Sequence, residues 1–263
     1  MSTPLTRRRV LTAVTAAGAL SIAGCTAPQS LDVEETITDE FDAETVSRLV
    51  VETTNGDVTV SGESRDTIAF TATKRATSEG QLENVDIETH LEEGVLTLAV
   101  EVDEGLFSFL RTGPRVDLEL DVPEDVNVTE GFETVESETT NGRVDVHRVR
   151  SDLSLMSTNG DVTGRQLEGG GVAGTTNGDI SLEFEQLQRD LTAETTNGDV
   201  ELVLPSTVDA ALSLDTVNGT VTTENLGDGT LDTDGTTLDT TLGDGTHAIT
   251  AETTNGNISV RGQ

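Results

Sequence analysis

Apolar and polar residues alternate along most of the chain after residue 45. At 116–122, Val and Leu take every second place and acidic residues fill the places between them. The same alternation runs through 67–73 and 94–102. A period of two is typical of a β-strand that buries one face. The pattern predicts an all-β protein without a helix of consequence.

A turn motif recurs within this alternation. The letters ETTNGDV stand at 52–58 and return at 194–200, and five near copies accompany them. Every copy contains an Asn-Gly pair, and the pairs are Asn55-Gly56, Asn141-Gly142, Asn159-Gly160, Asn177-Gly178, Asn197-Gly198, Asn218-Gly219 and Asn255-Gly256. From Asn141 onward the spacings are 18, 18, 20, 21 and 37 residues. The last spacing indicates a decayed copy at Asp234-Gly235.

Apolar residues keep fixed places around each Asn. They stand four and six residues before it and three and five after it, with exceptions such as Gly164 and Thr223. Each repeat therefore predicts a strand, a turn and a second strand. Asn and Gly both tolerate positive φ, which suits a sharp turn between the two strands.

Two architectures fit such a repeat. If each Asn-Gly closes a hairpin, the chain is an antiparallel β meander. If each is one corner of a coil of 18–21 residues, the coils stack as a β-solenoid. Stacking brings identical residues about 4.8 Å apart and allows Asn and Thr ladders. The repeated letters favour the solenoid, because identical turns bring no benefit in a meander.

The region after residue 45 has two parts. Residues 128–263 carry the regular repeats, whereas residues 64–122 predict longer strands and hairpins that elaborate the first coils. Within the second of these ranges, Phe107, Phe109 and Leu110 stand in a predicted loop, either folded back on the core or exposed to a partner.

The first 45 residues indicate a signal for export and for attachment to the membrane. Arg7 and Arg8 lie in a twin-arginine export motif, and a short apolar run to Ala23 follows. Cys25 comes after small residues, as in a lipobox, where a peptidase cuts before the cysteine and its sulfur receives a lipid. The chain is therefore predicted to consist of a signal peptide at 1–24, an acidic tether at 25–45 and a repeat domain at 46–263.

The amino-acid composition limits the classes of partner that the chain can bind. The chain has 49 acidic and 15 basic residues and a net charge of −34. Such a charge argues against nucleic acid and against electrostatic adhesion to anionic lipid. It resembles the composition of halophilic archaeal proteins, in which molar salt screens the repulsion. An acidic disordered chain would not need the regular alternation.

The TTNGDV copies, the DLELDVP segment ending at Pro123 and the period of about 19 residues resemble a family of exported β-strand-repeat domains described as candidate adhesins. The resemblance covers residues 46–263 and implies a right-handed β-solenoid. It implies no catalytic or binding residues. With the N-terminal address, it suggests a haloarchaeal lipoprotein.

Candidate chemistry is sparse. The three histidines have no metal-ligand spacing, no catalytic motif occurs, and we predict no cofactor and no metal site. The Asp that follows Asn-Gly in four copies could form a carboxylate column for Ca²⁺, or could stabilise the turns. Asn127, Asn218 and Asn257 lie in glycosylation sequons, of which Asn127 is the best candidate because it is outside the repeat turns.

The sequence thus predicts a non-enzymatic, lipid-anchored module on the outer face of the membrane, for adhesion or envelope scaffolding. Its partners would be membrane lipid through Cys25 and an unknown surface glycan or envelope protein. A sensor or accessory subunit with a membrane protein partner is the alternative. A polysaccharide-active enzyme is disfavoured, because six Phe and no Trp or Tyr leave few aromatic platforms for sugar.

Overall fold

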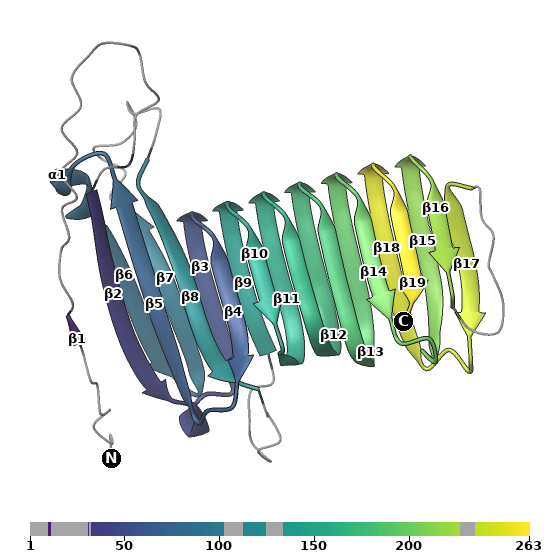
Figure 1. The fold of residues 1–263 in the computed structure, drawn as a ribbon, viewed down its shortest axis with the longest axis horizontal. Coiled ribbons are helices and arrows are strands. Elements are labelled where there is room, and N and C mark those ends of the chain that lie inside the picture. The colour runs from purple at the N-terminus through teal and green to yellow at the C-terminus, as the bar shows by residue number, and fades with distance from the viewer. Residues whose placement is uncertain (1–9, 12–30, 32, 103–112, 125–133, 227–234) are drawn as a thin grey trace, which may run out of the picture.

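The computed structural model describes residues 10–11, 31, 33–102, 113–124, 134–226 and 235–263. Within them the protein is all-β, as predicted, and its strands belong to one mostly parallel sheet that curls over on itself (Figure 1). Helical structure in these residues is limited to η1 (Ala43–Thr45) and the single turn α1 (Glu79–Leu82).

The strands follow the predicted alternation of buried and exposed residues. They are β1 (Val10–Leu11), β2 (Val33–Asp42), β3 (Arg48–Asn55), β4 (Val58–Glu63), β5 (Thr67–Ala76), β6 (Val85–Glu92), β7 (Val95–Val102), β8 (Arg115–Pro123), β9 (Thr134–Asn141), β10 (Val144–His147), β11 (Arg150–Asn159), β12 (Val162–Asn177), β13 (Ile180–Asn197), β14 (Val200–Leu204), β15 (Ala210–Asn218), β16 (Val221–Glu224), β17 (Thr237–Leu242), β18 (His247–Asn255) and β19 (Ile258–Gly262). In β5, for example, every second residue is buried.

Each repeat forms a coil of two strands joined at its Asn-Gly corner, and the coils stack in parallel. The strands before the corners pair in the order β3, β9, β11, β12, β13, β18 and β15, which we call the first stack. Those after the corners pair in the order β4, β10, β12, β13, β14, β19 and β16, the second stack. The long strands β12 and β13 contribute to both stacks.

The register brings the repeated turns into one column. Asn141 pairs with Asn55 on one side and with Asn159 on the other, and the match continues to Asn177 and Asn197. Asn255 and Asn218 complete the column. The antiparallel meander is therefore excluded for the repeat strands, because consecutive turns of a meander would lie at opposite ends of the sheet.

The order of the last coils differs from the sequence. Residues 247–262 form a coil between the coil of β13 and β14 and the coil of β15 and β16. The prediction of a decayed repeat copy at Asp234-Gly235 is wrong. Asp234 lies outside the described residues, and β17, which follows it, runs antiparallel to β15. The spacing of 37 residues spans this hairpin rather than two equal coils.

At the other end, the longer strands predicted for 64–122 are present. β7 and β8 extend the two stacks in parallel with β3 and β4. β6 then pairs antiparallel with β7, and β5 lies antiparallel between β8 and β2. In Figure 1 these strands make the N-terminal end of the molecule broader than the repeats. β1 adds a two-residue antiparallel bridge to β2.

The core lies between the two stacks and consists mainly of Val, Leu, Ile and Ala. Leu155, Ile180 and Leu202 are among its fully buried side chains. Each such side chain contributes about 1.5–3 kcal/mol by leaving water. Phe41 and Phe70 stack with ring centroids 6.2 Å apart at the broad end. The thin apolar layer agrees with the low aromatic content of the sequence.

Candidate functional site

The corners form one continuous line along the molecule, which we call the Asn-Gly edge. The amide of each Asn donates a hydrogen bond to the amide oxygen of the Asn in the neighbouring coil. The donor–acceptor pairs are Asn141–Asn55 2.8 Å, Asn159–Asn141 3.0 Å, Asn177–Asn159 2.8 Å, Asn197–Asn177 2.9 Å, Asn255–Asn197 2.8 Å and Asn218–Asn255 3.0 Å. All the bonds run in one direction, so the ladder is polar from end to end.

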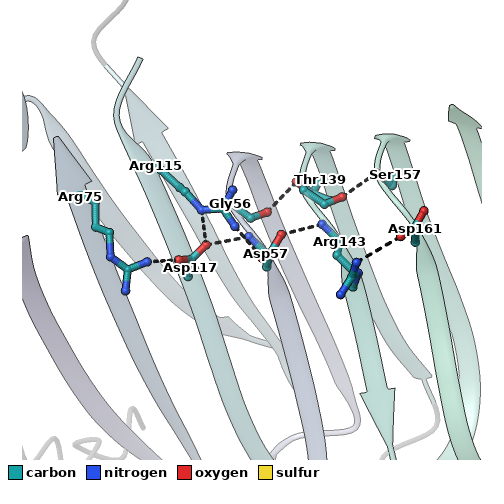
Figure 2. Close-up of polar contacts among 10 residues, drawn as sticks. Gly56, Asp57, Arg75, Arg115, Asp117, Thr139, Arg143, Ser157 and Asp161 are labelled. Atoms are coloured by element: carbon teal, nitrogen blue, oxygen red, sulfur yellow. Dashed lines mark hydrogen bonds and ion pairs between the residues drawn. The ribbon is translucent and has the colours of Figure 1, made fainter. Parts of the chain in front are cut away.

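The first Thr of the TTNG motif points inward and forms a second ladder. The Thr139 hydroxyl donates to the Gly56 carbonyl at 3.1 Å and Ser157 donates to Gly142 at 2.9 Å (Figure 2). The same bond recurs at Thr175, Thr195, Thr253 and Thr216. Thr53 belongs to the first coil, and its buried hydroxyl has no partner among the described residues. Each hydroxyl otherwise satisfies a carbonyl that the turn would leave unpaired.

The corner glycines are required by stacking, not by the positive φ that the sequence suggested. Only Gly56 has a positive φ, +149°, among the described Asn-Gly pairs. A Cβ at Gly178 would lie 2.2 Å from the carbonyl oxygen of Gly160, and at Gly142 1.8 Å from that of Gly56. A side chain would therefore collide with the backbone of the next coil at every corner.

The aspartates after the corners bind backbone amides of neighbouring coils. The Asp57 carboxylate accepts the amide of Arg143 at 2.8 Å, and Asp179 accepts that of Asp199 at 2.8 Å. Asp161 and Asp199 act in the same way. This arrangement favours the turn-stabilising reading over the Ca²⁺ column. Within the described part of the chain, no group of three or more His, Cys, Asp or Glu residues has a metal-binding arrangement.

Where the Asn-Gly edge meets the broad end, acids and arginines alternate (Figure 2). Arg115 contacts Asp117 at 2.8 Å and Asp57 at 2.5 Å. Arg75 continues the series through Asp117, and Arg143 does so through Asp161 at 3.2 Å. The pKa of Arg75 is raised, first by its hydrogen bond with Glu34 and then by the charge of Asp117. These contacts link the ends of β5 and β8 to the residues that directly precede β4 and β10.

The sequence alone did not identify this series. Arg75, Arg115 and Asp117 lie outside the repeats, far from Asp57 along the chain, and no spacing connects them. Lys74, the single lysine, was also missed as a structural residue. It is buried, donates to the Val85 carbonyl at 2.7 Å and lies 3.4 Å from Glu35.

Several predicted residues lie outside the described part of the chain. They are Arg7, Arg8, Cys25, Asn127 and the loop residues Phe107, Phe109 and Leu110. The other two sequon residues, Asn218 and Asn257, are exposed and engaged in the ladders, where Asn257 accepts the Thr220 amide at 3.1 Å. Across the described residues, the model contains no helix with the length and apolar character needed to cross a bilayer.

The comparisons with known proteins agree with this geometry. The model of the family described as Toastrack DUF4097 matches residues 32–261. The crystal structure of a candidate cell adhesion protein from Clostridium sporogenes aligns with a TM-score of 0.51 at 12% identity, covering 88% of this chain and 100% of that one. A candidate adhesin from Bacteroides fragilis aligns with a TM-score of 0.44 at 12% identity, covering 86% and 97%. No curated protein matches the chain.

Proposed function

Because the chain belongs to the toastrack family DUF4097, we propose that it is a non-enzymatic module that displays a rigid surface outside the cell for adhesion. The fold likeness to the Clostridium sporogenes protein supports this, since that protein is described as a candidate cell adhesion protein. A role in scaffolding of the envelope would depend on the same rigid surface.

The observation that carries the proposal is the Asn-Gly edge. Amide and hydroxyl ladders link every coil of the repeat to its neighbours, and carboxylates add further links between several of them. Such ladders oppose sliding and bending between coils, because each movement would break several bonds at once. In this proposal the repeat is a β-solenoid, with the right-handed coil that the family resemblance implies. The outer faces of its strands form the stiff surface that the module displays.

The proposal includes export and anchoring by the N-terminal segment. Arg7 and Arg8 would direct folded export, and cleavage before Cys25 would leave a lipid-modified cysteine at the start of the mature chain. The acidic tether at 25–45 would hold the domain away from the membrane. The net charge of −34 supports a haloarchaeal setting, where high salt screens the acidic surface.

The adhesion test uses the full chain in its host, displayed on the cell surface and compared with a strain that lacks it. We expect adherence to other cells or to envelope glycan only when the protein is present. Loss of the protein without any loss of adherence would sink the proposal. Selective cross-linking to one membrane protein would instead support the sensor or accessory role.

The anchor is tested separately with Cys25→Ser. Removing the thiol removes the site of lipid attachment, so the protein should move from the membrane fraction to the medium. Fractionation and immunoblotting measure the distribution, and Ser21→Ala serves as a control within the same segment. A Cys25→Ser variant that remains in the membrane fraction contradicts lipid anchoring.

A further inference from the structure

The outer face of the first stack carries a groove that crosses five strands, β11, β12, β13, β18 and β15. Its central row consists of one residue from each strand, in register from coil to coil. The row contains Met156, Gly174, Glu194, Glu252 and Asp215. We call this feature the outer-face groove. At about 4.8 Å per strand it is about 19 Å long.

The groove exists because one side chain is missing from the row. Gly174 stands where the neighbouring coils present Met156 and Glu194. The Met156 side chain leans into the gap, and its sulfur lies 2.8 Å from the place of a Cβ on Gly174. The result is a depression of about 390 Å³, lined by more polar than apolar surface, with a size within the range of about 300–1,000 Å³ found for ligand sites.

Among the described residues, the exposed large apolar side chains lie along this groove, two at one end and one at the other. The most exposed large hydrophobic side chains of the described residues are Met156 at 36%, Val172 at 40% and Val217 at 64%. All three line the outer-face groove. On a surface this acidic, apolar side chains collected in one depression indicate a binding site rather than chance exposure.

The polar side chains that line the outer-face groove indicate which chemical class of ligand it can bind. Glu194, Glu252 and Asp215 offer carboxylate acceptors, whereas Thr176, Thr196 and Thr254 offer hydroxyls that both donate and accept. The lining contains no lysine or arginine. An anionic ligand would face uncompensated carboxylates, and a purely cationic one would leave the threonines and the exposed side chains of Met156, Val172 and Val217 unused.

We propose that the outer-face groove binds a linear neutral glycan. Sugar hydroxyls would donate to the three carboxylates and exchange hydrogen bonds with the threonines. The C–H faces of the sugar rings would pack on Met156 and Val172 at one end and on Val217 at the other. A row of coils repeating every 4.8 Å or so suits a chain molecule laid across the strands. This inference rests on the proposed adhesive function and names its ligand.

The test measures binding of the purified full-length chain to cellohexaose, maltohexaose and mannohexaose by calorimetry, at low and at molar salt. Gly174→Glu should fill the depression with the side chain that Glu194 carries in the next coil, and Met156 has a flexible side chain that can move aside. We expect binding of at least one hexasaccharide, weakened about tenfold or more by Gly174→Glu and by Glu252→Gln. Glu138→Gln is the matched control, because Glu138 occupies the same row outside the groove.

The outcomes separate the two proposals. No binding of any hexasaccharide, or equal affinity of all variants, overturns the glycan site. Preferential binding of hexalysine or of a hyaluronan hexasaccharide also overturns it, because the groove would then select charge. If cells still adhere through the Gly174→Glu chain as they do through the wild type, adhesion stands and the groove is not its site.

Discussion

At the residue scale, the first Thr, the Asn, the Gly and the Asp of the TTNGD motif each meet a neighbouring coil in a different way. The first Thr donates to a glycine carbonyl, the Asn donates to the next Asn, and the Asp accepts a backbone amide. The glycine leaves room for the carbonyl of the coil beside it. The motif recurs because these contacts work only between like residues at like positions.

Replacement of Gly178 by Ala should destabilise the fold by about 3 kcal/mol, as overpacking does. The added Cβ would meet the Gly160 carbonyl oxygen at 2.2 Å, and backbone would have to shift. Gly80→Ala is the control, since nothing lies within 4 Å of its Cβ position. Chemical denaturation measures both variants. Equal stability of the two would contradict the close-stacking account.

The two threonines of one motif should respond differently to removal of the hydroxyl. Thr139→Val leaves the Gly56 carbonyl without its donor in a buried place and should cost about 1–2 kcal/mol. Thr140→Val, next in the chain and exposed, should change the stability by no more than about 0.5 kcal/mol. Denaturation midpoints decide the matter. A larger loss for Thr140→Val would show the hydroxyl ladder to be unimportant.

At the scale of elements, the last coil enters between two earlier ones. β18 pairs with β13 on one side and with β15 on the other, and both interfaces keep the Asn residues in register. The coil of β15 and β16 therefore depends on residues that follow it in the chain. In the native structure it joins the stack only through the C-terminal coil.

Truncation after residue 246 tests this order. Without β18 and β19, residues 210–218 lose their parallel partner and keep only the hairpin with β17, which is marginally stable by itself. We therefore expect their amides to exchange rapidly with solvent. The amides of 150–177 should remain protected, because their coils stack on each other. Hydrogen exchange with mass spectrometry follows both segments. Full protection of 210–218 in the truncated chain would mean that β15 can pair with β13 directly.

Asp209 connects the turn before β18 to the start of β15. Its carboxylate accepts the backbone amide of Thr246 at 3.0 Å and the hydroxyl at 2.8 Å. These bonds, the backbone one first, lower its pKa below the ordinary value of 3.8. The folded state thus binds the proton less tightly than the unfolded state. The stabilisation is present above pH 3.8 and is lost as the pH falls through the folded pKa.

Asp209→Asn should therefore lower the melting temperature at neutral pH. The difference from the wild type should shrink as the pH falls from 3.8 through the lower folded pKa of Asp209, below which both chains carry a neutral side chain. Melting curves across this range measure the difference. A gap that stays constant with pH would assign the effect to packing rather than to charge.

At the scale of the whole molecule, charge is the dominant property. A net charge of −34 repels itself across a thin two-layered fold, and the ion pairs of the broad end offset only a small part of it. Salt reduces the repulsion, because the Debye length falls from about 10 Å at 0.1 M to about 3 Å at 1 M.

The melting temperature should accordingly rise by several degrees when KCl is raised from 0.1 M to about 1 M. Sucrose at matched osmolality is the control, since it does not screen charge. A rise equal in both solutes would point to solvent exclusion, and an unchanged melting temperature in KCl would contradict the role of repulsion.

The sequence by itself determined the class of strand, the place of every repeat turn and the stacking of like residues. These follow from local chemistry: a period of two needs one buried face, and identical letters are useful only where identical residues meet. Asn55 and Asn141 are in register although 86 residues separate them, and the motif alone predicted that they would be equivalent.

Only the tertiary structure decided which coils are neighbours and what the outer face presents. Glu252 lies between Glu194 and Asp215, against the order of the chain, so the outer-face groove could not be read along the sequence. The pairing of Arg115 with Asp57 likewise depends on β8 lying beside β4. The period of two specifies which face of a strand is buried. The free energy of closing the whole stack, in contrast, decides which strands lie side by side.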